Sequence, residues 1–216
     1  MNKSLKKIVS QAKIIFWDFD GVIKDSVEVK SVAFESLFSE YGENLVNRVS
    51  SHHKKNAGLS RFDKIPLYLS WTNETITKKK IKELNIRFSL IVKESVISSK
   101  WVDGVIEFID GQHNLKKQIL LTATPIEEIE EILEKLNIKS FFYKVYGFPS
   151  NKTDGINEVL RDLKIESKHA IMLGDSMADY VAAENNKVLF LLRATDLNKN
   201  LQVKCKNRIF KDFTDE

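Results

Sequence analysis

The chain has 216 residues and carries 34 lysines and arginines against 30 aspartates and glutamates, which gives a net charge of +4. Hydrophobic residues make up 43% of it and charged residues 30%, so it can build a core, which excludes a wholly disordered or fibrous protein. A single cysteine excludes an internal disulfide framework and a cysteine-based zinc site.

The length indicates the domain organisation, and the hydropathy and charge distribution indicate the compartment and the partners. At about 150 residues per domain, the length predicts one core domain with a sizeable insertion. No apolar run approaches the roughly 18 residues of a membrane span, and the basic start leads into too short an apolar run for a secretory signal. The positive charge is spread evenly rather than gathered in a basic patch. We therefore expect a cytoplasmic protein, monomer or homodimer, with neither nucleic acid nor membrane as partner.

Four short apolar runs predict the strands of a parallel sheet. They lie at 14–17, 119–121, 170–173 and 188–192, and none alternates apolar with polar residues, as is typical of strands buried on both faces. Apolar residues recur at helical spacing over 126–136 and 156–163. Strands that alternate with helices predict a doubly wound α/β fold with right-handed crossovers.

The stretch between the first two predicted strands is too long for a single crossover helix. Apolar residues recur at helical spacing over 27–41 and again over 81–92, with no strand-like run between them. We predict a helical insertion at 26–100, packed over the end of the sheet. The core domain would then consist of residues 1–25 and 101–216.

Polar side chains follow three of the predicted strands, at the point where each strand ends. The sequence reads DFDG at 18–21, TATP at 122–125 and GDSMAD at 174–179. Because the carboxyl ends of parallel strands meet at one edge of a sheet, we expect these side chains to converge. The candidates are Asp18, Asp20, Thr122, Asp175 and Asp179, and Lys152 joins them at the start of the helix after the loop 147–151.

A convergence of aspartates points to a bound cation. One aspartate after a strand is more often a turn residue or helix cap, but four neighbouring carboxylates cannot all stay ionised without a cation. Oxygen ligands suit Mg²⁺, which binds carboxylates together with water and phosphate oxygens. Thr122 and Lys152 add a hydroxyl donor and a positive charge, and the helix after Pro125 can aim backbone N–H groups at an anion. The combination predicts phosphoryl transfer to a carboxylate.

These motifs, in this order, resemble the haloacid dehalogenase-like (HAD) superfamily. Its first motif, a hydrophobic strand followed by D-x-D-G-[TV], is matched by IFWDFDGV at 15–22. Its second is matched by LLT at 120–122, its single lysine by Lys152, and its G-D-(x)₃-D element by 174–179. The resemblance covers nearly the whole chain and implies a HAD-like Rossmannoid core. The insertion resembles the helical cap of the β-phosphoglucomutase and phosphoglycolate phosphatase branch.

The resemblance also implies roles for the motif residues. Asp18 would be the nucleophile that forms an aspartyl-phosphate, and Asp20 would protonate the leaving oxygen and then act as base for water. Because dehalogenases of this superfamily lack the second carboxylate, Asp20 favours phosphate chemistry over cleavage of a carbon–halogen bond. Mg²⁺ would be held by Asp18, the backbone carbonyl of Asp20, and Asp175.

The remaining motif residues would hold the phosphoryl group or orient its ligands. Thr122, Lys152 and the backbone N–H of Ala123 would bind the transferring phosphoryl. Asp179 would orient Lys152 or a metal-bound water rather than bind the metal directly.

Within the insertion, the sequence GLSR at 58–61 resembles the G-x-S-R loop of β-phosphoglucomutase-like caps. The resemblance makes Arg61 a candidate for holding a distal anionic group of the substrate, while Ser60 is expected to cap the following helix. His52 and His53 are further candidates for substrate contact, although packed or solvent-facing histidines are commoner. Lys24 and Lys30 flank the first motif and are candidates for facing the cleft.

The resemblance implies a Mg²⁺-dependent phosphatase acting on a small phosphorylated metabolite. The cap pattern also resembles a branch found with bacterial surface-polysaccharide assembly, which suggests a sugar phosphate or another phosphorylated building block. Two alternatives remain open: a β-phosphoglucomutase-like sugar phosphomutase, and a catalytically idle binding protein on the same fold. Stoichiometric release of phosphate would exclude the mutase, and the complete motif set speaks against the idle protein.

Overall fold

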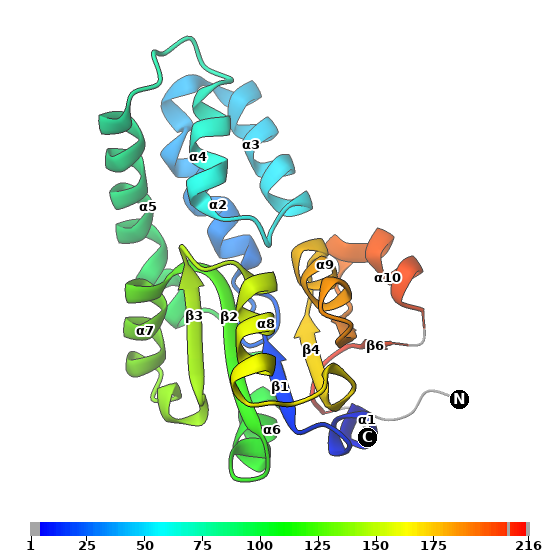
Figure 1. Cartoon of the computed structure of the whole chain (residues 1–216). Helices are drawn as coiled ribbons and strands as arrows, with labels where there is room; N and C mark the ends of the chain where they lie inside the picture. The colour runs from blue at the N-terminus through cyan, green and yellow to red at the C-terminus, as the bar shows by residue number, and fades with distance from the viewer. Residues whose placement is uncertain (1–4, 207, 215–216) are drawn as a thin grey trace.

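The computed structural model describes residues 5–206 and 208–214. This part of the chain contains a six-stranded sheet of order β3-β2-β1-β4-β5-β6, in which all neighbouring strands are parallel (Figure 1). The strands are β1 (Ile14–Trp17), β2 (Lys117–Pro125), β3 (Lys144–Phe148), β4 (Ala170–Gly174), β5 (Leu189–Arg193) and β6 (Ile209–Phe210). The strand order reverses between β1 and β4, the point where doubly wound sheets leave a crevice for ligands.

Helices cover both faces of the sheet, which confirms the predicted doubly wound fold. Successive residues of a strand point to opposite faces, so Ile15 and Trp17 join one buried cluster while Ile14 and Phe16 join the other. All four residues of β1 are fully buried, as their uninterrupted apolar run predicts. The first cluster is covered by α1 (Leu5–Ser10), α6 (Val105–His113) and α7 (Ile126–Lys135), and the second by α8 (Lys152–Asp162), α9 (Met177–Asn185) and α10 (Lys199–Cys205).

A helical bundle lies between β1 and β2 in the sequence. It consists of α2 (Val27–Leu37), α3 (Glu43–Lys55), α4 (Arg61–Leu69) and α5 (Lys78–Ser98). Figure 1 shows the bundle beyond the carboxyl ends of the strands, where the sheet presents its ligand-binding edge. Aromatic rings fill its interior: the Phe34 ring lies 5.4 Å from that of Tyr68 and 4.2 Å from that of Phe88. These rings belong to the same buried cluster as Ile15 and Trp17, so the core on this face of the sheet continues into the bundle.

The two connections between bundle and sheet are hydrogen-bonded to each other. The Asp25 backbone N–H donates to the Lys100 carbonyl at 2.9 Å, and the Val102 N–H donates to the Ile23 carbonyl at 3.0 Å. The connections thus form a short two-stranded junction.

The structure differs from the sequence prediction in several short elements. β3 and β6 were not expected, because β3 is interrupted by a glycine and begins with a lysine, and β6 has two residues. Helix α9 was not expected either, because its buried apolar contacts come from the small residues Ala182 and Ala183. Among the described residues, no helix is both long and apolar enough to cross a membrane.

Candidate active site

The site begins where β1 and β4 end side by side. Trp17 pairs with Leu173 in the parallel register, and the Asp18 backbone N–H donates to the Leu173 carbonyl at 2.9 Å. The chain then turns at Gly21, whose φ of +77° favours glycine. A side-chain Cβ at Gly21 would lie 2.1 Å from Asp175 Oδ2. The turn after Asp18 is therefore packed directly against the Asp175 carboxylate.

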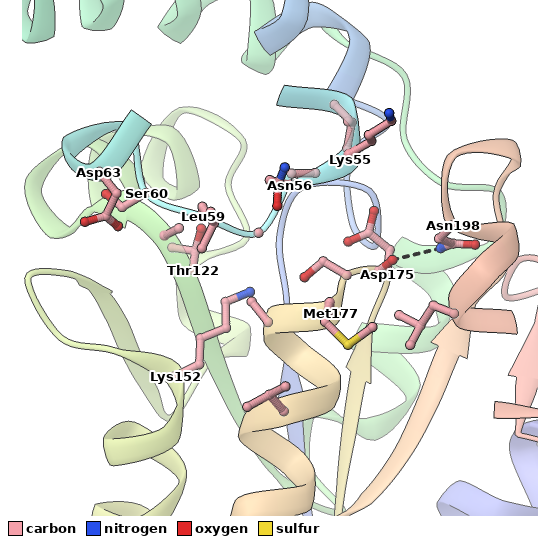
Figure 2. A pocket seen from close by; sticks show the side chains of 18 of the residues that line it. Lys55, Asn56, Leu59, Ser60, Asp63, Thr122, Lys152, Asp175, Met177 and Asn198 are labelled. Carbon is pink, nitrogen blue, oxygen red and sulfur yellow. Dashed lines mark hydrogen bonds between the residues drawn. The ribbon is translucent and has the colours of Figure 1, made fainter. Parts of the chain in front are cut away.

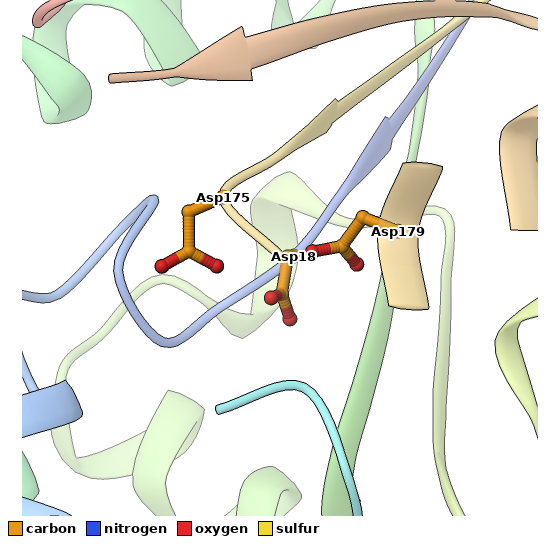
Figure 3. Close-up of side chains that lie close together, drawn as sticks. All are labelled: Asp18, Asp175 and Asp179. Atoms are coloured by element: carbon orange, nitrogen blue, oxygen red, sulfur yellow. The ribbon is translucent and has the colours of Figure 1, made fainter. Parts of the chain in front are cut away.

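Three aspartates meet at this edge. One carboxylate oxygen from each of Asp18, Asp175 and Asp179 lies within 4.8 Å of the others, and all three residues are buried (Figure 3). Asp20, which was expected in the same cluster, is not part of it. Its carboxylate turns instead toward residues at the start of α2.

Asp179 uses its carboxylate for internal contacts. Its Oδ2 accepts hydrogen bonds from the backbone N–H of Ser176 at 3.0 Å and from the Ser176 hydroxyl at 2.6 Å. Its Oδ1 accepts from Lys152 Nζ at 2.5 Å. The same Nζ lies 2.7 Å from Asp18 Oδ1. Asp179 therefore fixes both the start of α9 and the ammonium group that reaches Asp18.

Asp18 and Asp175 keep carboxylate oxygens that are not used in such contacts. Asp18 Oδ1 also accepts from the Phe19 backbone N–H at 2.7 Å, so its contacts fall on one oxygen. Within residues 5–206 and 208–214, Asp18 Oδ2 and the Asp175 carboxylate accept no hydrogen bond. Asn198, which the sequence did not single out, donates to the Asp175 backbone carbonyl at 2.8 Å (Figure 2). It holds the main chain and leaves the carboxylate free.

The negative charge of the three carboxylates in the cluster is not fully balanced by the one ammonium group beside them. Burial, and then the charge of Asp179, raises the pKa of Asp18 to about 7 against the opposing charge of Lys152. Burial, followed by the charge of Asp18, also raises the pKa of Asp175. Burial alone would lower the pKa of Lys152, but Asp179 and Asp18 outweigh it and hold that pKa above its ordinary value. One ammonium group faces three carboxylates, and the free oxygens are the ligands that Mg²⁺ prefers. The residues present therefore fit a divalent cation.

The Asp20 carboxylate is held at both oxygens. Its Oδ1 accepts from the Ser26 hydroxyl at 2.5 Å, and its Oδ2 lies 2.5 Å from Lys30 Nζ. The same Nζ donates to Thr124 Oγ1 at 3.0 Å. Lys30, which was a candidate for facing the cleft, thus contacts the first motif and is not among the residues that line the cavity.

A cavity of about 870 Å³ lies beside the cluster (Figure 2). Asp175 lines it, whereas Asp18 and Asp179 are not among its lining residues. Its floor includes Thr122, Ala123, Lys152 and Asp175, which the sequence predicted for this site. Its opposite wall comes from the helical bundle, where Lys55, Asn56 and residues 57–60 line it. The sequence did not single out Lys55 or Asn56, and a lysine at a helix end gives no signal of facing a cavity.

The loop between α3 and α4 rests on the catalytic edge itself. A Cβ at Gly58 would lie 2.3 Å from Ser176 Oγ, so backbone and hydroxyl are in close contact there. Ser60 accepts a hydrogen bond from the Phe62 backbone N–H at 3.3 Å and caps α4, as expected.

The Arg61 side chain points to Glu128, although the resemblance predicts that it contacts the substrate. Its Nη1 donates to Glu128 Oε1 at 3.0 Å and its Nη2 donates to Glu128 Oε2 at 2.9 Å, with the Ser89 hydroxyl also contacting Glu128. The side chains of Arg61 and Glu128 are 9% and 6% exposed, and neither residue lines the cavity. The guanidinium that was expected to hold substrate instead joins α4 to α7.

The other candidates in the insertion are also packed away from the cavity. His52 Nδ1 lies 3.1 Å from the Tyr68 hydroxyl, and the buried His53 lies 3.0 Å from Lys64 Nζ. Burial lowers the pKa of His53 to about 2, so its ring is neutral. Neither histidine lines the cavity.

Lys24 is buried in the junction between bundle and sheet. Its Nζ donates to the Ile97 carbonyl at 3.0 Å and lies 4.1 Å from the centroid of the Trp101 ring. It fixes the connecting segments and does not face the cavity.

Comparisons with known proteins agree with this arrangement. A model of the haloacid dehalogenase-like hydrolases matches residues 14–192. A structure described as a predicted phosphoglycolate phosphatase from Haemophilus somnus is similar with a TM-score of 0.75 at 18% identity, covering 94% of this chain and 95% of that one. A mutant of CbbY from Rhodobacter sphaeroides, in complex with xylulose 1,5-bisphosphate, has a TM-score of 0.75 at 13% identity. The match covers 94% of this chain and 95% of that one. A haloacid dehalogenase-like hydrolase from Streptococcus pneumoniae has a TM-score of 0.69 at 17% identity, and the match covers 93% of each chain. The family model spans most of the chain, including the strands that carry Asp18, Thr122 and Asp175. The chain therefore belongs to the haloacid dehalogenase-like hydrolase family.

Proposed function

We propose that this protein is a Mg²⁺-dependent phosphatase that hydrolyses the phosphate monoester of a small metabolite. The observation that carries the proposal is Asp18, a buried carboxylate with one oxygen held by Lys152 and the other free, beside the free carboxylate of Asp175. The cavity that Asp175 lines is within the size range of small-molecule sites.

The proposed reaction proceeds in two displacements at phosphorus. Asp18 attacks the phosphorus, the bond to the ester oxygen breaks, and that oxygen keeps the bonding electron pair and takes a proton from Asp20. Water then attacks the phosphorus of the aspartyl-phosphate and gives a proton to Asp20, while the bond to Asp18 breaks. Thr122, Lys152 and the Ala123 N–H would bind the phosphoryl oxygens and stabilise the charge that develops on them.

Asp18, Asp175 and the backbone carbonyl of Asp20 would hold the Mg²⁺. The metal would neutralise charge on the transferring phosphoryl and lower the repulsion between it and Asp18. Asp179 supports this arrangement through Lys152, since both of its oxygens are already used.

The helical bundle of residues 26–100 would act as a cap that selects the leaving group. Lys55, Asn56 and Ser60 line the cap side of the cavity, and Asn198 and Asn200 line the core side. A polar leaving group such as a sugar or a related hydroxylated building block suits these amide, hydroxyl and ammonium groups. The surface-polysaccharide link rests on the sequence resemblance alone.

The proposal is tested by phosphate release from an aryl phosphate with and without Mg²⁺. We expect Asp18→Asn to abolish release, because an amide cannot form the aspartyl-phosphate, while Asp162→Asn on the exposed end of α8 leaves it unchanged. Full turnover by Asp18→Asn would remove the nucleophile assignment. A screen of phosphorylated metabolites with the same readout would then identify the substrate, and transfer of phosphate to a second hydroxyl without release would indicate a mutase.

A further inference from the structure

We propose that the leaving group of the substrate carries a hydrocarbon part, which lies against an apolar wall of the cavity formed by Leu59, Met177, Val181 and Leu197. The inference rests on the proposed function and narrows its substrate class to the phosphate monoesters of amphiphilic alcohols. The sequence motifs leave the wall open to variation, because Leu59 and Met177 fill variable motif positions and Val181 and Leu197 lie outside the motifs.

Helix α9 presents two apolar side chains to the cavity. Met177 and Val181 are four residues apart, so they lie on one face of the helix, and both line the cavity. They are 44% and 43% exposed, whereas Ala182 and Ala183 are buried in the core. A surface helix usually carries polar residues on its outward face. The apolar pair therefore marks this face as one that contacts more than water.

Apolar side chains from other segments line the same cavity. Leu197, in η4 (Asp196–Asn198), is 46% exposed, and Leu59 reaches the cavity from the loop between α3 and α4 (Figure 2). Phe148 adds an aromatic ring, which is stacked on the ring of Phe62 with the centroids 4.1 Å apart. Scattered apolar residues on a surface need no explanation, but a patch that lines one cavity is typical of a ligand-binding groove.

The apolar wall shares its cavity with the residues proposed to bind the phosphoryl group. Thr122, Lys152 and Asp175 line the cavity, and its volume of about 870 Å³ leaves room for a leaving group much larger than the phosphate. Small-molecule sites typically combine an apolar lining with a few polar groups that fix orientation. Lys55 and Asn56 provide such groups for hydroxyls of the same leaving group. The lining as a whole therefore suits an amphiphilic alcohol.

Burial of a hydrocarbon part predicts a graded preference for chain length. Primary alkyl phosphates release alcohols of nearly equal acidity, so the bonds that form and break are equivalent in ethyl phosphate and hexyl phosphate. Each methylene that becomes fully buried should raise kcat/KM about fourfold. Because the wall is partly open to solvent, we expect the four additional methylenes to raise kcat/KM by at least ~10-fold in total. A wholly polar site would not distinguish the two esters.

The test measures the ratio of kcat/KM for hexyl phosphate to that for ethyl phosphate, by phosphate release with Mg²⁺. The triple variant Met177→Gln, Val181→Thr and Leu197→Asn keeps the side chains close to their size and removes apolar surface, so the ratio should fall at least ~5-fold. Any loss shared by both esters cancels in the ratio. Leu115→Asn, which replaces a 74% exposed leucine that does not line the cavity, is the control and should keep the wild-type ratio.

Two results would overturn the inference: hydrolysis of both esters by the wild-type protein with equal kcat/KM, or an unchanged preference in the triple variant. Circular dichroism and thermal unfolding check that the triple variant folds. The single variant Val181→Thr, which exchanges one methyl for a hydroxyl, takes its place if it does not, with a smaller fall in the ratio expected.

Calorimetric binding of ethylphosphonate and hexylphosphonate separates this inference from the proposed function, because a carbon–phosphorus bond is not hydrolysed as an ester is. We expect the wild-type protein with Mg²⁺ to bind hexylphosphonate at least ~10-fold more tightly, with the more negative heat-capacity change that apolar burial gives. If this preference is present but neither ester is hydrolysed, the proposed function fails and the apolar wall stands. Equal affinities, or binding of neither phosphonate, would contradict the apolar wall.

Discussion

Lys152 balances part of the negative charge at the site through direct contacts with two buried carboxylates. Its Nζ lies 2.7 Å from Asp18 and 2.5 Å from Asp179, and its side chain is 9% exposed. Removing one partner from such a buried group leaves charge uncompensated in a place that water does not reach. Lys152 therefore affects both the fold and the reaction.

We predict that Lys152→Met lowers the free energy of unfolding by about 3 kcal/mol at pH 7 without Mg²⁺, because two buried carboxylates lose their cation. Phosphate release should fall by about 10²- to 10³-fold, as expected when a fixed charge on the transferring phosphoryl is lost. Urea unfolding and steady-state kinetics measure the two effects. Lys168→Met, which removes an exposed lysine paired with Glu166, is the control and should change neither. Unchanged stability in Lys152→Met would contradict the buried ion pairs.

At the residue level, sequence prediction worked where a side chain follows a buried strand. Asp18, Thr122 and Asp175 are placed by the chain immediately before them, and the parallel sheet then brings them together. Arg61 could not be placed in this way, because its partner Glu128 is 67 residues away on another helix. A local sequence pattern cannot show an ion pair between residues that are distant in the sequence. Arg61 was therefore assigned to substrate binding from the motif resemblance alone.

Among the elements, α4 and α7 are joined by a buried, bidentate ion pair. The Arg61–Glu128 contact crosses from the helical bundle to the core, and more exposed pairs join α5 to α7, such as Lys93 with Glu131 at 29% and 43% exposure. Exposed pairs contribute little to stability, whereas breaking a buried one is costly. The contact between cap and core should therefore depend mainly on Arg61 and Glu128.

We predict that Arg61→Met destabilises the protein by about 3–5 kcal/mol, because it leaves the Glu128 carboxylate buried without its partner. The double variant Arg61→Met with Glu128→Leu should recover most of that loss, since both charges are then absent. A double-mutant cycle measured by urea unfolding gives the coupling. Lys93→Met is the matched control and should cost less than ~1 kcal/mol. If the double variant is no more stable than Arg61→Met, the pair does not set the cap contact.

Helix α4 also buries a second cation, Lys64, against α3. Burial, and then the charge of Lys30, lowers the pKa of Lys64 from 10.5 to about 7. The groups that face it are His53 on α3, Lys30 on α2, Asp63 on its own helix, and Asp20. Because the folded-state pKa lies below the unfolded one, the unfolded chain binds more protons between these two values, and stability rises with pH over that window.

We predict that Lys64→Met is more stable than the wild-type protein at pH 6, by about 1–3 kcal/mol, because it removes a buried charge without a carboxylate partner. The gain should shrink between pH 7 and 8.5, where wild-type Lys64 is increasingly neutral in the folded state. Urea unfolding at several pH values measures it, with Lys168→Met as the control. A gain that does not vary with pH would show that Lys64 titrates normally.

A helix or strand could be predicted from the sequence when most of its buried positions carry apolar residues. β1, β4 and β5 were found because their two-sided burial leaves uninterrupted apolar runs. In the bundle, the sequence indicated α2 and α5, whereas α3 carries only two buried residues, Val49 and His53, and gave no apolar stripe. The cavity wall formed at the end of α3 was therefore not foreseen.

For the whole molecule, binding of the proposed cation at the acidic cluster would stabilise the fold. Asp18, Asp175 and Asp179 are buried together, and their mutual repulsion opposes folding until a cation compensates it. A ligand that binds only the folded state stabilises it by about 2.7 kcal/mol at 100 times its Kd.

We predict that Mg²⁺ raises the melting temperature, and that Asp175→Asn removes most of this shift because it takes away a free carboxylate ligand. Differential scanning calorimetry with Mg²⁺ and then with excess chelator measures the shift. Asp162→Asn, an exposed aspartate away from the cluster, should shift as the wild-type protein does. An undiminished shift in Asp175→Asn would place the cation elsewhere.

The paired connections at Ile23–Asp25 and Lys100–Val102 hold the two crossings between bundle and sheet side by side. Hydrogen bonds tie the two segments together, and the Lys24 ammonium against the Trp101 ring adds a further contact at the same junction. The loop at Gly58 touches Ser176, so the bundle forms one wall of the cavity next to the aspartates. Any movement of the bundle away from the core would have to break the buried Arg61–Glu128 pair, which joins α4 to α7.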